Sequence, residues 1–431
     1  MLRKWATAGV LVAVPCAAFA QGAPDPVANS GDTAWILVSS ARVLLMTLPG
    51  LGLFYGGLVR AKNVLSVLLQ IGAVAGVASL LWIVVGYTLA FGDVSGGWLG
   101  NGRAWMLTAL GDLRAGLTIP ESAFAMFQLT FAAITPALMI GAWVDRARFS
   151  WVVMFCAIWG LLVYAPVAHW VWGGGWLAAR GALDFAGGMV VHTTAGVSAL
   201  VIALLLGKRQ GFPGPALLPH APGLTMLGAM FLWVGWFGFN GGSALAAGDG
   251  AAMAIINTHA AAATAALVWL AIERVTFGKP TTVGFATGAI AGLATITPGA
   301  GFVSAGAAIA IGALAAVVCY FAIQLIKNRL RIDDSLDVFA VHGVGGMLGS
   351  LLLAIFISPA LGGTGHPGDL SGGAFVGAQA LGVAAVALWS AIATAVSALA
   401  VSLFLPMRVG VDDERQGLDI ASHGERGWEF D

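Results

Sequence analysis

Two histidines lie inside long apolar segments, where an ionisable side chain is expensive and usually has a function. They are His192 and His342, and an aspartate precedes each of them, Asp184 and Asp337. A neutral imidazole has one donor and one acceptor, so a pair can relay a proton or hydrogen-bond a small neutral molecule. If the two segments belong to inverted repeats, the histidines meet near the midplane. Otherwise each is hydrogen-bonded separately within its own helix packing.

Aromatic residues gather at the expected outer ends of several segments. Phe127 and Phe131 lie one helical turn apart on one face, and Trp172 precedes a run of three glycines. Phe239 and Ser243 share a third segment. Tryptophan and tyrosine at helix ends are ordinarily interface anchors. Aromatic faces also attract a small cation as it loses water, so an anchor and a cation–π cage are both open interpretations.

The composition places these residues in a membrane protein. Of 431 residues, 59% are hydrophobic and only 9% are charged, whereas soluble domains carry roughly 25% charged residues. The net charge of zero provides no basic excess for nucleic acid. The sequence has no clustered nucleophile, phosphate loop or metal-ligand spacing, and Cys16, Cys156 and Cys319 are far apart. We therefore expect neither an enzyme nor a metal or cofactor site.

Eleven segments are long and apolar enough to be read as spans, since a helix needs about 20 residues to cross a bilayer. They are 33–59, 63–91, 121–144, 149–171, 186–206, 223–245, 251–272, 281–299, 303–326, 335–357 and 375–404. The fold class is an all-α membrane protein with eleven transmembrane helices, arranged as an inverted 5+5 repeat and one C-terminal helix. Residues 33–404 form the transmembrane domain, and 405–431 form a cytoplasmic tail.

The termini and loop charges predict the orientation. Residues 1–20 have a basic start, a short apolar stretch and a small-x-small site before residue 21, so they read as a cleaved signal peptide. Residues 21–32 then form a short periplasmic segment. Fourteen basic residues fall in the loops that would be cytoplasmic, and only Arg103, Arg114 and Arg180 fall in the outer loops. We expect a multi-pass protein of a bacterial inner membrane, with its N-terminus outside and its C-terminus inside.

Several long motifs occur in a fixed order from about Thr33 to the C-terminus. They are Pro49–Asn63 (PGLGLFYGGLVRAKN), Ala168–Gly175 (AHWVWGGG), Gly181–Gly188 (GALDFAGG), Gly235–Ser243 (GWFGFNGGS) and Asp333–Gly345 (DDSLDVFAVHGVG). With these motifs the chain resembles the ammonium transporter family (Amt/Mep/Rh). The resemblance implies a homotrimer with one hydrophobic pore per subunit, which carries ammonium or ammonia. The tail segment Gly417–Glu425 resembles that of bacterial members, which implies binding of a PII-type nitrogen-regulatory protein.

The resemblance also assigns roles to single residues. Phe127, Phe131, Trp172 and Ser243 match an outer site that recruits ammonium. Phe131 and Phe239 match the two rings that gate the pore, and His192 and His342 match the twin histidines that line it. Asp184 matches a buried aspartate that shapes the recruitment site without touching the substrate.

Two residues depart from the family pattern. Pro136 lies just past Phe131 and could bend that helix, and His259 is a third intramembrane histidine, interpreted as a packing or lumen residue. Two other functions stay open: a Rhesus-like channel for neutral gas, and an ammonium sensor that signals through the tail and transports little. The presence of Trp172 argues against the first. The short tail, about 27 residues after the last span, argues against the second.

Overall fold

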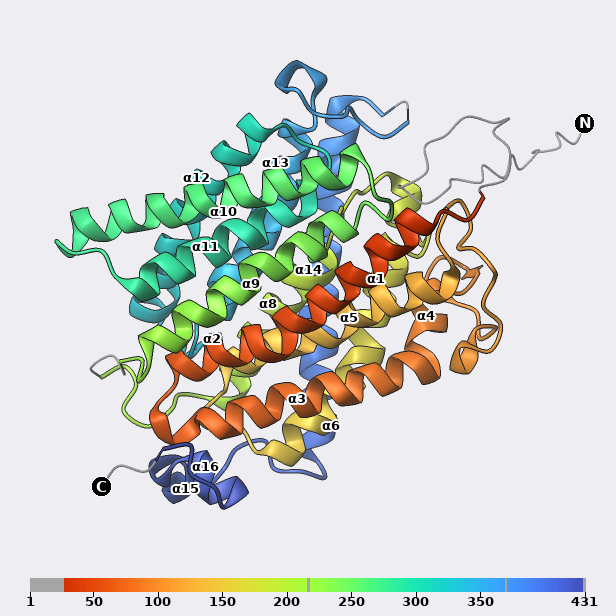
Figure 1. Cartoon of the computed structure of the whole chain (residues 1–431). Coiled ribbons are helices and arrows are strands. Elements are labelled where there is room, and N and C mark those ends of the chain that lie inside the picture. The colour runs from red at the N-terminus through yellow and green to blue at the C-terminus, as the bar shows by residue number, and fades with distance from the viewer. Residues whose placement is uncertain (1–26, 215–217, 369, 429–431) are drawn as a thin grey trace, which may run out of the picture.

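The structure, a computed structural model, describes residues 27–214, 218–368 and 370–428. Long helices lie side by side through the whole of this part of the chain (Figure 1). The described strands are two short ones, β1 (Val94–Ser95) and β2 (Leu99–Gly100), which pair as an antiparallel hairpin. The prediction of a predominantly helical protein is confirmed. The expected signal segment, 1–20, lies outside the described residues.

Ten helical stretches in the described ranges are long and apolar enough to cross a bilayer, and each overlaps a predicted span. They are Ser30–Leu58 (α1 Ser30–Leu45, α2 Leu51–Leu58), Ala61–Phe91 (α3 Val64–Leu81, α4 Tyr87–Phe91), Glu121–Ala142 (α5 Glu121–Met139), Phe149–Val171 (α6 Phe149–Trp159, α7 Ala165–Val171), Gly188–Leu206 (α8 Thr194–Leu206), Pro222–Gly242 (α9), Asp249–Phe277 (α10 Asp249–Thr276), Ala305–Arg329 (α12 Ala305–Ile323), Phe339–Phe356 (α13 Gly345–Phe356) and Gly372–Ser402 (α14).

The predicted span 281–299 is the one that comes out short. It forms α11 (Thr282–Ile296), 15 residues long, and a single further turn, Thr297–Gly299. At Pro298 the α-helix gives way to this turn, because the proline nitrogen has no hydrogen to donate to a helical hydrogen bond. α11 packs against α9, α10, α12 and α13, so its surroundings are mostly protein. The exact count of eleven spans therefore stays a prediction.

Proline does not break the helix that carries the predicted gate ring. Pro136 lies inside α5, which nevertheless runs as one helix from Glu121 to Met139. The hydroxyl of Thr135 donates to the carbonyl of Phe131 at 2.6 Å, which satisfies one carbonyl near the proline. The expected bend thus leaves Phe131 on a continuous helix at the centre of the bundle.

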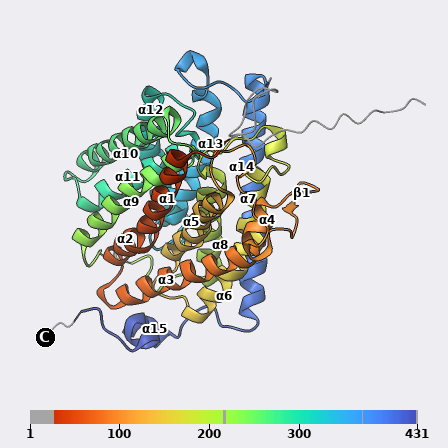
Figure 2. The same cartoon turned by 45° about the vertical axis from the view of Figure 1, so that its right-hand side comes forward.

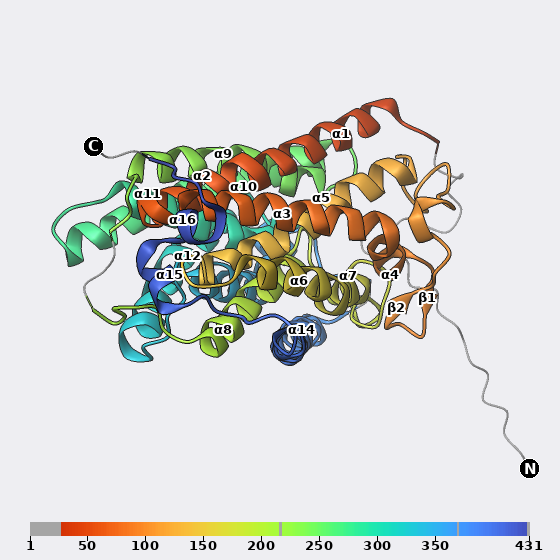
Figure 3. The ribbon, with the colours of Figure 1, turned by 90° about the horizontal axis from the view of Figure 1, so that it is seen from below.

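The two ends of the bundle differ, as Figures 1, 2 and 3 show from three directions. One end, the tail face, carries the short helices α15 (Val411–Gln416) and α16 (Leu418–His423). The other end, the hairpin face, carries β1 and β2 and the long connection from α4 to α5. The start of α1 belongs to the hairpin face, because the amide of Asn29 donates to the carbonyl of Thr118 at 2.9 Å.

Candidate functional site

The two intramembrane histidines meet in the structure. Nδ1 of His342 lies 3.2 Å from Nδ1 of His192, and the rings are stacked at 22°. Both side chains are almost completely buried. A neutral pair at this distance needs one ring to donate and the other to accept. Of the two interpretations left open by the sequence, the structure supports the paired one.

Helix geometry explains why the pair forms. His192 lies in a π-helical turn (Gly188–Thr193) that leads into α8, and His342 lies in a second one (Phe339–Val344) that leads into α13. Such turns are rare and occur frequently at functional sites. The two segments can approach closely because both have a glycine at the point where they cross. A Cβ on Gly196 would lie only 2.2 Å from the Cα of Gly343. Any larger residue there would push the histidines apart.

Asp184 fixes the start of the helix that carries His192. Its two carboxylate oxygens accept four backbone N–H bonds, from residues 187–190, at 2.7–3.0 Å. These are the amides that a helix start otherwise leaves unpaired. The backbone carbonyl of Asp184 also accepts a 2.7 Å bond from Nε1 of Trp172. The aspartate therefore joins the tryptophan of the expected cage to the histidine of the expected pore.

The predicted gate rings lie directly against each other. The ring centroids of Phe131 and Phe239 are 4.3 Å apart and tilted by 36°. Trp172 stands edge-on to Phe131 at 5.7 Å, on one side of this pair. His192 stacks on Phe239 at 6.1 Å, on the other side. The four rings thus follow one another from the hairpin face toward the midplane.

A small cavity of about 50 Å³ lies on the hairpin side of the predicted gate rings. Its walls are Phe91, Phe124, Gln128, Phe131, Trp172, Leu183, Asp184, Phe185, Ser243, Leu245 and Phe302. Three of the four expected recruitment residues line it. The fourth, Phe127, is fully buried and contacts Phe131 at 5.0 Å, so it supports the cavity wall from behind.

Two polar groups in this cavity can accept a hydrogen bond from a guest. The Ser243 hydroxyl donates to the carbonyl of Phe239 at 2.8 Å, which leaves its oxygen free to accept. Oε1 of Gln128 is buried and has no partner among the described residues. The sequence analysis missed Gln128, although its place one residue after Phe127 in an apolar helix is a usable signal.

The space beyond the predicted gate rings, where the lumen is expected, is narrow and apolar. A cavity of about 10 Å³ there is lined by Met46, Leu51, Phe54, Ile134, Leu138, Val191, His192, Leu232, Trp236, Phe239 and His342. This is roughly the space that one water-sized molecule needs. Nε2 of His192 is buried here without a partner in the described chain. The histidines therefore provide the polar edge of a space for a single small molecule.

A wide vestibule of about 710 Å³ opens on the tail side. His342 is part of its wall as well as of the narrow lumen. Charged groups surround it, including Arg60, Asp145 and Arg209, and Lys327, which pairs with Asp337 at 2.8 Å. The histidine pair thus stands between a closed aromatic side and an open polar side.

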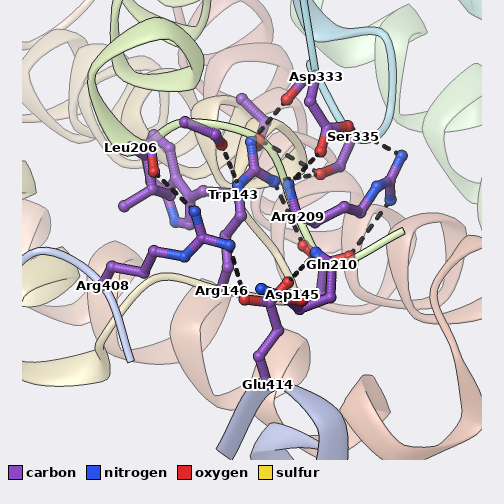
Figure 4. A network of polar contacts seen from close by, with 12 residues as sticks. Trp143, Asp145, Arg146, Leu206, Arg209, Gln210, Asp333, Ser335, Arg408 and Glu414 are labelled. Carbon is purple, nitrogen blue, oxygen red and sulfur yellow. Dashed lines mark hydrogen bonds and ion pairs between the residues drawn. The ribbon is translucent and has the colours of Figure 1, made fainter. Parts of the chain in front are cut away.

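A buried ion network supports the vestibule wall (Figure 4). Arg209 pairs with Asp145 at 3.3 Å and with Asp333 at 3.1 Å. Burial acts to raise the pKa of the Asp145 carboxyl, but Arg209 and Arg146 together hold it below its usual value. The sequence analysis counted Arg146 and Arg209 only as topology signals.

The tail helices are fastened to the same wall. Glu414 of α15 is buried, pairs with Arg408 at 2.7 Å and accepts the amide of Gln210 at 2.6 Å. Gln210 lines the vestibule, so one carboxylate joins the tail to the vestibule wall (Figure 4). In α16, Asp419 accepts the amide of Ser66 at 2.8 Å.

Asp334, at the start of the His342 segment, gives a pH-dependence that can be tested. Burial, and then the charge of Asp337, raise its pKa to about 6. Between the unfolded value and pH 6 the folded chain holds a proton that the unfolded chain lacks, so stability falls as pH rises through this window. We expect Asp334→Asn to be more stable than the parent above pH 6, by about 3 kcal/mol.

The measurement is unfolding in mixed detergent micelles from pH 4 to pH 8, for both proteins. The difference between them should be small near pH 4 and reach its full size above pH 6. A difference that stays constant over the whole range would contradict the assignment. The asparagine can still accept the 2.7 Å bond from the amide of Phe339, so the helix start is kept.

Comparisons with known proteins agree with this arrangement. Residues 34–428 match the family model described as the Ammonium Transporter Family. A relative named "Ammonium transporter" from Aquifex aeolicus is 47% identical, covering 93% of this chain and 94% of that protein. A "Putative ammonium transporter" from Methanothermobacter thermautotrophicus is 46% identical, covering 93% and 98%.

Solved structures have the same fold. One titled "Sensor Amt Protein" gives a TM-score of 0.85 at 31% identity and covers 91% of this chain and 98% of its own. Mep2 of Saccharomyces cerevisiae gives a TM-score of 0.83 at 38% identity, covering 89% and 88%. The ten apolar helices and these matches make the chain a multi-pass membrane protein. On the family model and the named relatives together, the chain belongs to the Ammonium Transporter Family.

Proposed function

We propose that the chain recruits ammonium in the cavity beside Trp172, takes a proton from it, and conducts ammonia through the lumen of the twin histidines. The observation that carries this proposal is the 3.2 Å contact between His192 and His342. It lies in a space sized for one small molecule, between a closed aromatic gate and an open vestibule.

Recruitment follows from the chemistry of the cavity walls. A cation over aromatic faces gains attraction that grows as its water is removed. Phe131 and Trp172 supply the faces, while Ser243 and Gln128 supply oxygens that accept N–H bonds. Ammonium has four N–H donors and potassium has none. The polar oxygens therefore favour ammonium over an ion of similar size.

The gate and lumen then favour loss of the proton. A bare ion in an apolar passage loses its hydration without replacement, which costs several kcal/mol or more. Ammonia is neutral and avoids this cost. It can hydrogen-bond to the histidine nitrogens along the lumen, because each imidazole offers a donor and an acceptor.

The histidine pair also offers a route for the released proton. His192 and His342 contact each other through Nδ1, so a proton added to one ring can pass to the other. His342 borders the vestibule, where water can take the proton up. Transport is then electrogenic if the proton crosses to the vestibule with the ammonia. It is neutral if the proton returns to the side from which the ammonium came.

Topology and assembly complete the proposal. We infer eleven spans in an inverted 5+5 repeat with one further helix, and a homotrimer in a bacterial inner membrane. The hairpin face would be periplasmic and the tail face cytoplasmic. Lys62 and Arg60 on the tail face both bond to backbone carbonyls of α15, and basic residues are typical of the cytoplasmic side.

Regulation is proposed at the tail. α15 and α16 lie against the tail face, and Glu414 joins them to the wall of the vestibule. A PII-type nitrogen-regulatory protein that binds this face would reach both the tail helices and the opening of the vestibule. The structural neighbour titled "Sensor Amt Protein" supports a second candidate, an ammonium sensor that signals through the tail.

The deciding experiment measures current from purified protein in proteoliposomes after an ammonium pulse, with potassium as the control ion. An ammonium-specific current supports electrogenic transport. Internal alkalinisation without current would mean neutral ammonia conduction, as in a Rhesus-like channel. If neither signal exceeds that of empty liposomes, the transport proposal fails and the sensor remains.

Trp172→Leu tests the recruitment site. Loss of one aromatic wall should raise the half-saturating ammonium concentration roughly 2- to 30-fold, the range that a cation–π contact is worth. Trp172→Phe keeps an aromatic ring and loses the bond to the Asp184 carbonyl. Its half-saturating ammonium concentration should therefore lie between that of the parent and that of Trp172→Leu. Trp105→Leu, at a tryptophan that is 53% exposed on the hairpin face, is the matched control. An unchanged concentration and selectivity in Trp172→Leu would remove Trp172 from the site.

A further inference from the structure

An arginine in the middle of a membrane helix has no polar partner in the part of the chain that the structure describes. Arg42 belongs to α1 and is half-buried. Within the described residues its guanidinium has no hydrogen bond or ion pair, and it stands over the ring of Trp35 at 5.8 Å. A charge at such a depth is costly against lipid and is normally paired.

A histidine shares this situation on a neighbouring helix. His259 of α10 was interpreted from the sequence as a packing or lumen residue, but it is exposed on the outside of the bundle. Its ring contacts Trp233 at 5.4 Å and Phe237 at 6.0 Å, both on α9. In the described chain the imidazole has no hydrogen-bond partner.

One helix separates the two groups. α1, α9 and α10 lie side by side on one face of the bundle, with α9 in contact with both others (Figure 1). The stem of Arg42 lies in the crevice at Gly238, where a Cβ would be 2.7 Å from that of the arginine. His259 lies on the opposite flank of α9. Within one copy the two side chains therefore point away on either side of α9.

The two groups lie at the same depth. The amide of Ala247 donates to Asp32 at 2.7 Å, so the chain enters α1 and α10 at one level. Arg42 is ten residues beyond Asp32, and His259 is twelve beyond Ala247. At the helical rise these separations are roughly 15 Å and 18 Å, which is near the middle of a bilayer.

We propose that Arg42 of one copy donates to the imidazole of His259 on the neighbouring copy. The guanidinium has only donors and a neutral imidazole has a free acceptor, so the two complement each other. Each copy has the guanidinium of Arg42 on one flank of α9 and the imidazole of His259 on the other. In the homotrimer proposed above, each copy gives its arginine to one neighbour and its histidine to the other, so the contact is head-to-tail and closes into a ring.

The surroundings of the pair suit a protein partner. Val38 and Leu45 lie one turn on either side of Arg42, and Ile256 lies one turn from His259; all three are exposed. On α9, between them, Met230 and Val234 are exposed as well. These apolar residues would surround the polar pair and keep lipid and water from it. The inference concerns assembly and does not depend on the transport proposal.

Thiol cross-linking in native membranes tests the contact. Arg42→Cys with His259→Cys is made in a chain whose own cysteines are replaced by alanine. A short bifunctional methanethiosulfonate is used, because the two Cβ atoms of such a pair are too far apart for a direct disulfide. The double variant should give a ladder that ends at a closed trimer, whereas a ladder that ends at the dimer would mean a reciprocal two-fold contact and would overturn the ring. A mixture of the two single variants should stop at dimers, and neither single variant alone should cross-link.

The control pairs Arg42→Cys with Leu388→Cys, at a residue of α14 that is 63% exposed. It should give no ladder. Cross-linking of Arg42→Cys with itself would mean a two-fold contact and would overturn the head-to-tail ring. Absence of a ladder in the Arg42→Cys, His259→Cys variant, with both thiols shown to be reactive, would overturn the contact.

A double-mutant cycle distinguishes a protein partner from an anionic lipid. His259→Leu should shorten the lifetime of the oligomer in detergent by about tenfold, because it leaves Arg42 unpaired. Arg42→Leu with His259→Leu should recover most of that lifetime. If the two changes act independently, and Arg42→Leu instead lowers retention of phosphatidylglycerol against phosphatidylcholine, the partner is a lipid phosphate and the proposal fails.

Discussion

Replacement of His192 or His342 by alanine is expected to abolish the ammonium-evoked current while leaving the protein folded. Either change removes one partner of the 3.2 Å contact, which is the polar contact in a lumen otherwise lined by apolar side chains. A charged or proton-carrying species then faces apolar walls, at a cost of several kcal/mol. Since 1.4 kcal/mol is a tenfold change, we expect the current to fall about 100-fold or more.

The measurement uses proteoliposomes with equal amounts of each variant, and size-exclusion profiles to verify that the fold is kept. His366→Ala is the matched control, because His366 lies in a loop beside Phe375 and lines neither lumen nor vestibule. Its current should equal that of the parent. Undiminished current in both lumen variants would exclude the histidine relay. Lost current with retained alkalinisation would mean that the pair carries the proton and that ammonia still passes.

The sequence was sufficient to find the spans and the histidines, because both depend on local properties. A run of 20 apolar residues predicts a span wherever it occurs. An ionisable residue inside such a run marks a functional candidate without knowledge of its neighbours. His192 and His342 were found in this way, and ten of the predicted spans form helical stretches that are long and apolar enough to cross a bilayer.

What the sequence could not provide is which groups meet. The histidines touch because two π-helical turns and the contact of Gly196 with Gly343 aim them at each other. No residue pattern predicts a π-helical turn, and a glycine pair is informative only after the crossing is known. For the same reason His259 was expected inside the bundle. In the structure it lies on the outward face of α10 and is exposed.

Arg146 illustrates the same limit and leads to the second large expected effect. Its guanidinium is fully buried and makes four bonds: to the carbonyl of Gly207 at 3.0 Å, to Ser335 at 2.7 Å, to the carbonyl of Asp333 at 2.6 Å and to Asp145 at 3.3 Å. From the sequence it is one basic loop residue among many. In the structure it holds three separate segments together (Figure 4).

Arg146→Met is therefore expected to lower the free energy of unfolding by about 3–5 kcal/mol, the usual result when one partner of a buried ion pair is removed. The measurement is equilibrium unfolding in mixed detergent micelles at pH 7. Arg148→Met, two residues away and exposed, is the control and should stay within about 0.5 kcal/mol of the parent. Equal effects of the two changes would contradict the role assigned to the network.

Arg146→Lys separates charge from geometry in the same network. Lysine keeps the positive charge next to Asp145, but its ammonium has three donors around one point and cannot reproduce a planar fork. The carbonyls of Gly207 and Asp333 lie on different segments, so one ammonium cannot serve both with good geometry. We expect Arg146→Lys to recover less than half of the stability lost in Arg146→Met. Full recovery would mean that charge alone stabilises the vestibule wall, and that the planar fork of the arginine is not needed to join its segments.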